Sequence, residues 1–374
     1  MNLVQLNNNQ RAFFSLIKAG LWEKETYLAQ FEPIDFREVF RLAEEQSVVG
    51  LIAAGFEFAR DIKIPQNISL ELAGQALQLE QRNLAMNQFI ADIVDKMRKA
   101  GIYTLLVKGQ GVARCYEKPL WRTCGDVDFL LSDDNYAKAK EYLLSVATNI
   151  EKEGTYSRHL ALTVDQWAVE LHGTLRCSFS SRVDRYLDVI QRETFFDGKV
   201  RPWMNGNTHV FMMSVENDII YIFAHFLKHF YLEGIGLRQI CDWCRMLWTY
   251  RDKMDIKQIE RMIGGMKLMS EWKAFGAFAV EYLGMPVEAM PLYSHDTKWK
   301  QKAVGVCSFI MEVGNFGHNR DSSYYTKPFI VRKTMSFMRR CGDVIRHAKL
   351  FPLDSLRFFF CITKNGIKAA AKGK

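Results

Sequence analysis

One stretch of this chain decides its fold, Arg122-Thr123-Cys124-Gly125-Asp126-Val127-Asp128-Phe129-Leu130-Leu131, in which two acidic residues interrupt an apolar run. Side chains at positions i and i+2 leave the same face of a strand, so Asp126 and Asp128 point toward one spot. Two carboxylates near apolar walls repel each other, and a divalent cation between them would remove that repulsion. Ligand sets made of oxygen alone favour Mg²⁺ or Mn²⁺. A pair of solvated acids in a turn is the alternative, but Asp is uncommon inside strands.

A third acidic residue lies in a second strand pattern. In Trp167-Ala168-Val169-Glu170-Leu171-His172, large apolar residues alternate with small or polar ones, which predicts a half-buried strand with Glu170 and His172 on one face. If this strand lies beside the aspartate strand, three carboxylates converge and can hold two metal ions for phosphoryl transfer. A salt bridge from Glu170 to a basic residue such as Arg122 is the alternative. His172 could bind metal, orient a phosphate or hydrogen-bond the backbone.

The order of these motifs resembles a known superfamily. A strand that ends in Lys108-Gly109, a short helix, Arg122, the Gly-Asp-x-Asp motif and then Glu-Leu-His is similar to the polymerase-β-like nucleotidyltransferases. Within that superfamily the pattern most resembles an uncharacterised bacterial group with Lys-Gly … Arg … Gly-Asp-x-Asp … Glu-Leu-His. The resemblance to the catalytic core covers residues 100–190 or so.

The resemblance implies an activity and a set of site residues. The activity is transfer of a nucleoside monophosphate from an NTP, for example ATP, to an acceptor hydroxyl with release of pyrophosphate, and Mg²⁺ or Mn²⁺ is the cofactor. Asp126, Asp128 and Glu170 match the catalytic, metal-binding carboxylates. The positions that the resemblance places at the nucleotide are Lys108, Gly109, Gln110, Arg122, Gly125 and His172. The chain departs from the common form, because Gln110 and Gly111 follow Gly109 where that form has Gly-Ser or Gly-Gly, and the gap to the aspartates is longer.

For two basic residues of this set, the sequence also allows a purely structural role in place of nucleotide binding. Lys108 follows an apolar strand, where its side chain could reach solvent or contact a phosphate. Arg122 could pair with Asp126 or Glu170, or bind a β- or γ-phosphate with two hydrogen bonds. At the level of sequence these alternatives stay open.

Periodicity divides the chain into four regions. We expect a helical region at 1–100, a nucleotidyltransferase-like sheet domain at 101–200, a helical domain at 201–326 and a basic helical tail at 327–374. The expected strands span 102–107, 126–131, 158–163 and 167–171, with a turn at 109–111 and only helices after Pro202. The predicted fold class is therefore α+β, a small mixed sheet flanked by helical N- and C-terminal regions.

The positive charge is concentrated at one end of the chain. Lys327 to Lys374 contain twelve Lys or Arg residues against two Asp residues, a balance of +10, so the other residues sum to −2 within the net charge of +8. Phenylalanines are interleaved with these charges. The tail is expected either to pack as a helix pair with a basic outer face, or to contact an anionic lipid surface or RNA.

Composition predicts an ordered, cytoplasmic protein. With 48% hydrophobic residues the chain is not a disordered tether. The sequence contains no apolar run of about 18 residues, so we expect no transmembrane segment, and we expect no signal peptide. The eight cysteines are scattered, as reduced thiols would be, and Cys241-x-x-Cys244 is expected to pack within a helix.

Further candidates lie in the helical region beyond residue 201. His225 and His229 have the i, i+4 spacing of a transition-metal site, but no third ligand is evident, so a polar helix stripe is the alternative. Arg238 and Asp242 are expected to form an ion pair on a helix surface.

Two functions fit these patterns. The first is a metal-dependent nucleotidyltransferase whose acceptor is a small molecule, a protein or RNA. The second is a non-catalytic nucleotide-binding or regulatory module with a helical partner interface. Neither the acceptor nor the preferred base is marked by a motif.

Overall fold

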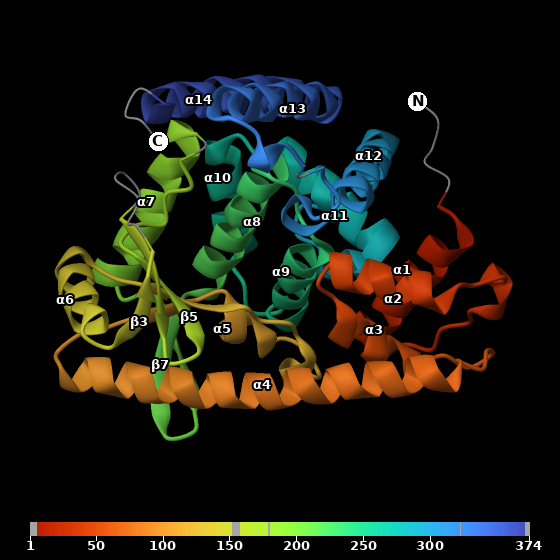
Figure 1. Ribbon diagram of the computed structural model, residues 1–374, viewed down its shortest axis with the longest axis horizontal. Helices are drawn as coiled ribbons and strands as arrows, with labels where there is room; N and C mark the ends of the chain where they lie inside the picture. Colours follow the sequence, from red (N-terminus) through yellow and green to blue (C-terminus); the bar gives the residue numbers. More distant parts are fainter. Residues whose placement is uncertain (1–5, 152–157, 179, 322, 371–374) are drawn as a thin grey trace.

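Seven strands form one mixed sheet in the computed structural model, which describes residues 6–151, 158–178, 180–321 and 323–370 (Figure 1). The strands are β1 (Leu105–Val107), β2 (Asp126–Leu130), β3 (Ala147–Ile150), β4 (His159–Val164), β5 (Trp167–His172), β6 (Val200–Asn205) and β7 (Thr208–Met213). Their order across the sheet is β3-β4-β5-β2-β1-β7-β6. Strand β2 is parallel to β5 and antiparallel to β1, and the predicted α+β class is confirmed.

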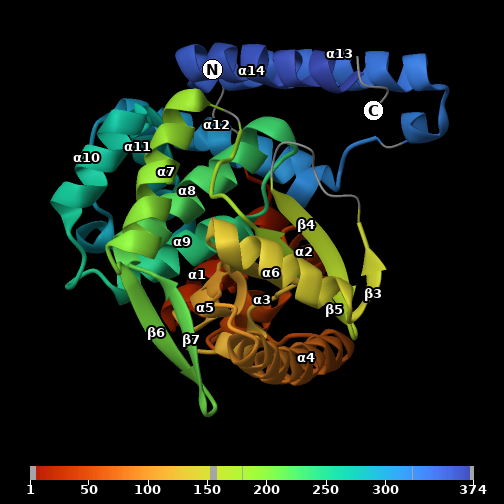
Figure 2. The same ribbon diagram turned by 90° about the vertical axis from the view of Figure 1, so that its left-hand side faces the viewer.

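Helices flank the sheet and make up most of the remaining chain (Figures 1 and 2). The helices are α1 (Asn8–Trp22), α2 (Phe36–Glu45), α3 (Val49–Phe56), α4 (Gln66–Lys99), α5 (Gly109–Ala113), α6 (Asp133–Leu144), α7 (Ser181–Phe196), α8 (Val215–Leu232), α9 (Leu237–Thr249), α10 (Ile256–Met266), α11 (Met269–Leu283), α12 (Thr297–Val313), α13 (Phe329–Leu350) and α14 (Pro352–Ala370). Short 3-10 turns lie at Ala29–Phe31, Pro119–Trp121, Val287–Ala289, Asn315–Gly317 and Ser323–Thr326.

The long helix α4 joins the sheet to the N-terminal helices (Figure 1). Its first half buries Ile68 and Leu72 in a core shared with α1 to α3. Its second half buries Met86, Ile90 and Met97 in a separate core under the sheet. The apolar spacing of three and four residues predicts this helix, and the structure confirms it. The domain boundary that we expected at residue 100 therefore lies between this helix and the sheet that the helix packs against.

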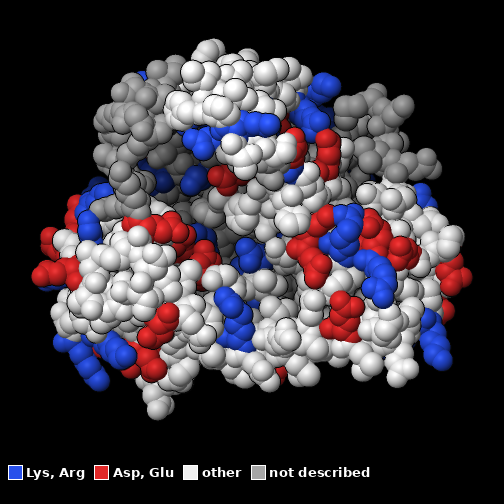
Figure 3. Space-filling model, viewed as in Figure 1, with Lys and Arg blue, Asp and Glu red and all other residues white. Residues whose placement is uncertain are grey.

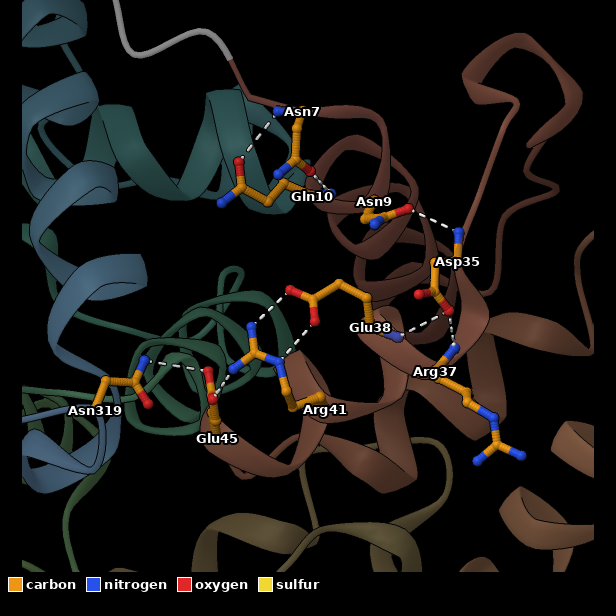
Figure 4. Close-up of polar contacts among 9 residues, drawn as sticks. All are labelled: Asn7, Asn9, Gln10, Asp35, Arg37, Glu38, Arg41, Glu45 and Asn319. Carbon is orange, nitrogen blue, oxygen red and sulfur yellow. Dashed lines mark hydrogen bonds and ion pairs between the residues drawn. The ribbon is translucent and has the colours of Figure 1, made fainter.

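Polar contacts fix the N-terminal helices in place (Figure 4). Asn7 caps α1 by accepting from the Gln10 amide at 2.9 Å, and the Gln10 side chain returns the contact at 3.2 Å. Arg41 of α2 pairs with Glu45, which also accepts from the Asn319 side-chain amide at 3.1 Å. Residues 274 positions apart are thus joined, so α2 is anchored to the segment that follows α12.

A β-hairpin occupies residues that were expected to be helical. Strands β6 and β7 pair from Val200↔Met213 to Asn205↔Thr208, with Gly206 at φ 59° in the two-residue turn. Such turns need a positive φ, which glycine adopts without cost. Strand β6 lies at the edge of the sheet, where Pro202 removes no ladder hydrogen bond that the sheet requires. The expected helix after Pro202 is wrong, and the sheet extends beyond residue 200. Strand β3 was also not predicted.

The C-terminal tail forms the helix pair α13–α14 along one end of the molecule (Figures 1 and 2). Phe351 and Phe358 are buried, at 2% and 1% exposure. The side chains of Ile330, Met338 and Phe360 are 67–77% exposed, so the helix pair buries only part of its apolar surface. Across the described residues, no helix combines the length and apolar character needed to cross a membrane. None of the eight cysteines, all of which the structure describes, is in a disulfide, and Cys241 and Cys244 are buried in α9 as expected.

Candidate active site

Three carboxylates meet on one face of the sheet. The parallel register pairs Asp128 of β2 with Glu170 of β5, so Asp126, Asp128 and Glu170 leave the sheet on the same side. One oxygen of each lies within 4.8 Å of the others. The intervening residues, Val127, Phe129 and Val169, point into the core below. The two strand alternations therefore build this convergence, as the sequence predicts.

Asp128 sits at the centre of a charged cluster. Its Oδ1 accepts from Lys108 Nζ at 2.9 Å and lies 2.8 Å from His172 Nε2. Burial raises the pKa of Asp128, but the positive charge of Lys108 and the hydrogen bond from His172 outweigh burial and hold that pKa below its usual range. Burial lowers the pKa of His172, yet its hydrogen bonds to Asp128 and Glu170 leave it above the usual value. Asp128 is thus a carboxylate that faces an ammonium group and an imidazole.

Of the three carboxylates, Asp126 is the one whose charge no hydrogen bond or ion pair within the described residues compensates. The charge of Asp128, followed by burial, raises the pKa of Asp126. Within the described part of the chain its carboxylate has no hydrogen-bond or ion-pair partner. A divalent cation bound between Asp126 and Asp128 would relieve this repulsion, so the donor set fits the oxygen-rich sites of Mg²⁺ or Mn²⁺.

Glu170 is held by two histidines. Its Oε2 lies 2.9 Å from His159 Nε2 and 3.3 Å from His172 Nε2. Burial raises the pKa of Glu170, but these hydrogen bonds outweigh burial and hold it below the usual range. The expected alternative, a salt bridge to Arg122, is wrong. His159 was not among the predicted site residues, although His159 of β4 faces His172 directly in the antiparallel register.

Lys108 reaches the cluster through a strained backbone. Its φ of 58° and ψ of −145° belong to a region that is almost restricted to glycine. Helix α5 begins at the next residue, so the expected turn at 109–111 is instead the first turn of a short helix. Gly109 has φ 45°, and a Cβ there would lie 3.3 Å from the Cys124 sulfur. The strain directs the Lys108 side chain, which is 18% exposed, toward Asp128.

Two of the predicted nucleotide-binding positions do not contribute a side chain to this cluster. Gln110 is 3% exposed, and its amide donates to Asn83 Oδ1 on α4 at 2.7 Å. It therefore joins α5 to α4. Gly125 precedes Asp126 at the surface, where a Cβ would meet nothing within 4 Å, so the space around it does not require glycine.

Arg122 is committed to a buried ion pair. Its guanidinium donates to Asp242 of α9 through Nε at 3.0 Å and Nη2 at 2.5 Å, and Tyr116 donates to the same carboxylate at 2.8 Å. The expected pairings of Arg122 with Asp126 or Glu170 are therefore wrong. So is the expected surface pair of Arg238 with Asp242, because α9 is buried on nearly all sides and Asp242 is 6% exposed.

A pocket lies between the carboxylates and helices α8 and α9. Its lining includes Lys108, Asp126, Asp128, His225 and Arg238. Figure 3 shows the molecule hollowed near the centre of this face, with acidic and basic side chains around the hollow.

Arg238 lines this pocket, although the sequence predicted it only as half of a surface ion pair. It donates to the Thr123 carbonyl at 3.0 Å, and its buried Nε has no partner among the described residues. No carboxylate forms an ion pair with this guanidinium among the described residues, and burial, then the charge of Arg122, lowers the pKa of Arg238. The sequence of α9 gives no signal for this role, because its charged residues alternate with apolar ones as they would on a helix at the surface.

The two histidines of α8 face different partners. His225 Nε2 lies 3.4 Å from Lys108 Nζ in the pocket, whereas His229 Nδ1 lies 3.1 Å from Glu233. Burial and the charge of Lys108 hold the pKa of His225 well below its usual value, so this imidazole is neutral. In the described residues neither histidine belongs to a group of three metal-ligating side chains. The structure thus offers no third ligand for the spacing that suggested a metal site.

One comparison with known proteins identifies the family of this chain. No curated protein sequence matches the chain. A crystal structure of an antigenic nucleotidyltransferase-like protein from Paracoccidioides brasiliensis is similar at 13% identity and a TM-score of 0.33, over 54% of this chain and 93% of that one. Residues 32–283 match a family described as uncharacterised nucleotidyltransferase. This match spans β1 to β7 with the carboxylates, and it covers more than half of the sequence, so the chain belongs to that nucleotidyltransferase family.

Proposed function

We propose that the protein transfers a nucleoside monophosphate from an NTP to an acceptor hydroxyl, with Mg²⁺ or Mn²⁺ as cofactor. The observation that carries this proposal is the convergence of Asp126, Asp128 and Glu170. Among the described residues the Asp126 carboxylate has no partner, and it lines a pocket with the cationic side chains of Lys108, Arg122 and Arg238. Family membership supports the reaction class.

The carboxylates would hold the metal. Asp126 and Asp128 supply oxygen ligands from one rigid strand, and Glu170 supplies a third from its neighbour. A bound metal ion would neutralise phosphate charge and lower the pKa of the acceptor hydroxyl. Lys108 and His172 already compensate the negative charge of Asp128, so this carboxylate would be ionised before a metal ion binds.

The basic side chains would hold the triphosphate. Lys108 and Arg238 line the same pocket as the aspartates, and Arg238 has an unused donor there. Both are cations in a partly buried site, where charge-assisted hydrogen bonds to phosphate are strong. Arg122 would act indirectly, since its pair with Asp242 fixes α9 and therefore Arg238. Positioning and charge stabilisation would then supply the catalysis.

A ligand-dependent thermal shift tests the binding site. Mn²⁺ with NTP is expected to raise the melting temperature of the wild type but not that of Asp126→Asn, because ligands stabilise only the state that binds them. Asp252→Asn, at a side chain that is 80% exposed, is the matched control and should shift like the wild type. Equal shifts in Asp126→Asn and the wild type would refute the metal site.

Transfer is tested separately from binding. Incubation with each α-³²P-labelled NTP, Mn²⁺ and cell extract should label an acceptor, whether a small molecule, a protein or RNA. Metal-dependent nucleotide binding without any labelled product would favour the alternative, a non-catalytic nucleotide-binding module whose helical regions bind a partner.

We also propose that the tail contacts an anionic lipid surface. On α13 and α14, exposed apolar side chains such as Ile330, Met338 and Phe360 lie among exposed basic ones. The exposed basic residues are Arg332, Lys333, Arg346, Lys349, Arg357 and Lys364. This combination is typical of helices that lie in a membrane interface.

A further inference from the structure

We propose a second metal site beside the carboxylates, formed by His159, Glu170 and His172, which takes a divalent transition metal ion such as Zn²⁺. These side chains leave neighbouring strands on one face, because His159 of β4 is registered opposite His172 of β5 and Glu170 lies two residues before His172. The site shares Glu170 with the oxygen-rich site but uses two imidazole nitrogens in addition.

The distances suit a metal ion. His159 Nε2 and His172 Nε2 lie 2.9 and 3.3 Å from Glu170 Oε2, and all three ligand atoms lie within 4.8 Å of one another. Ligands bound tetrahedrally at zinc distances of about 2.0–2.2 Å are separated by about 3.3 Å. The two distances to Glu170 Oε2 lie within a few tenths of an ångström of this separation, and the two imidazole nitrogens lie within 4.8 Å of each other.

The two sites differ in their ligand chemistry. Imidazole nitrogen favours zinc and related transition metals, whereas carboxylate oxygen alone favours Mg²⁺ and Mn²⁺. Asp126 belongs only to the oxygen set and His159 only to the nitrogen set. Each site can thus be removed by one substitution that leaves the other set intact.

The second site is rigid and accessible. All three ligands lie on paired strands, so their backbone positions are fixed before a metal binds. His159 is 35% exposed and Glu170 27%, which leaves an entry path, while His172 is 13% exposed. A metal ion here would take the place of the histidine hydrogen bonds to Glu170.

Zinc titration of the full-length protein tests the proposal without nucleotide. After removal of metals with a chelator, the wild type is expected to compete with a chromophoric zinc indicator. His159→Ala should weaken zinc binding by about tenfold or more. His295→Ala, at an exposed histidine between α11 and α12, is the matched control and should bind like the wild type.

Co²⁺ provides a spectroscopic readout of the same ligands. The wild type should show visible absorption bands that are lost in His159→Ala and retained in Asp126→Asn. Equal zinc affinity in the wild type and His159→Ala would overturn the proposal, as would loss of zinc binding in Asp126→Asn or its absence in the wild type. Since no nucleotide is present, these outcomes are independent of whether nucleotidyl transfer occurs.

Discussion

At the scale of single residues, Lys108 holds a backbone conformation that lysine rarely adopts. Strain of this kind persists where the surrounding structure enforces it, and it is concentrated at functional sites. Here it delivers the ammonium group to Asp128, at 2.9 Å. The strain and the ion pair can be separated by substitution, because glycine removes both whereas methionine removes only the charge.

Lys108→Gly is therefore expected to be more stable than Lys108→Met, by about 1–3 kcal/mol, the usual cost of such a conformation. Both variants leave Asp128 without its ammonium partner, so they differ mainly in the backbone. Urea unfolding measures the difference. Equal stability would show that the backbone at this position is not strained, and both variants should lose the stabilisation by NTP.

The two aspartates of the Asp-x-Asp motif are expected to respond differently to neutralisation. Asp128→Asn should lower the free energy of unfolding by about 1–3 kcal/mol, since Lys108 and His172 lose a buried charged acceptor. Asp126→Asn should leave stability unchanged or raise it, because it removes a repelled carboxylate. Chemical denaturation at neutral pH compares them. Equal destabilisation by both would contradict the asymmetry.

At the scale of elements, Glu271 of α11 links two helices through a buried carboxyl group. It is fully buried, accepts from the Tyr231 hydroxyl of α8 at 2.9 Å, and lies near Asp354 of α14. Burial, then the charge of Asp354, raises the pKa of Glu271 to about 8 from an ordinary 4.5. The folded protein thus keeps a proton that the unfolded chain releases.

This proton makes stability depend on pH. A carboxyl group whose folded pKa is raised contributes stability that is fully present below 4.5 and is lost as the pH rises through about 8. Unfolding followed between pH 5 and 9 should show a decline in the wild type. Glu271→Gln, which carries no charge at any of these pH values, should show a flatter profile. A profile identical to that of the wild type would exclude Glu271 as the cause.

At the scale of the whole molecule, the tail departs from the body in its surface chemistry. Reversal of Arg332, Lys333 and Lys349 to Glu should abolish retention on vesicles that contain anionic lipid at low salt. Nucleotide- and metal-dependent thermal shifts should be unaffected, because these residues lie outside the pocket. Polar substitution of the exposed Ile330 and Met338 should also weaken vesicle binding. Retention that is unchanged by both sets would show that the basic tail is only a solvated face.

The sequence by itself determined the strands of the site and the direction of their side chains. Alternation places Asp126 and Asp128 on one face of β2, and Glu170 with His172 on one face of β5. These features are local, since a period of two depends only on the strand. The long helix α4 and its end before Gly101 follow from equally local signals.

The tertiary structure decided which residues meet across the chain. Nothing local connects Arg122 with Asp242, Lys108 with His225, or His159 with Glu170, because the chain must first fold to bring them together. Charged residues have several possible partners in sequence, and burial selects the partner that compensates each charge. The hairpin β6–β7 was missed for a different reason. Its Gly206-Asn207 turn signal is local. Pro202, however, is compatible with a strand only because that strand lies at the sheet edge, and only the assembled sheet specifies where its edge is.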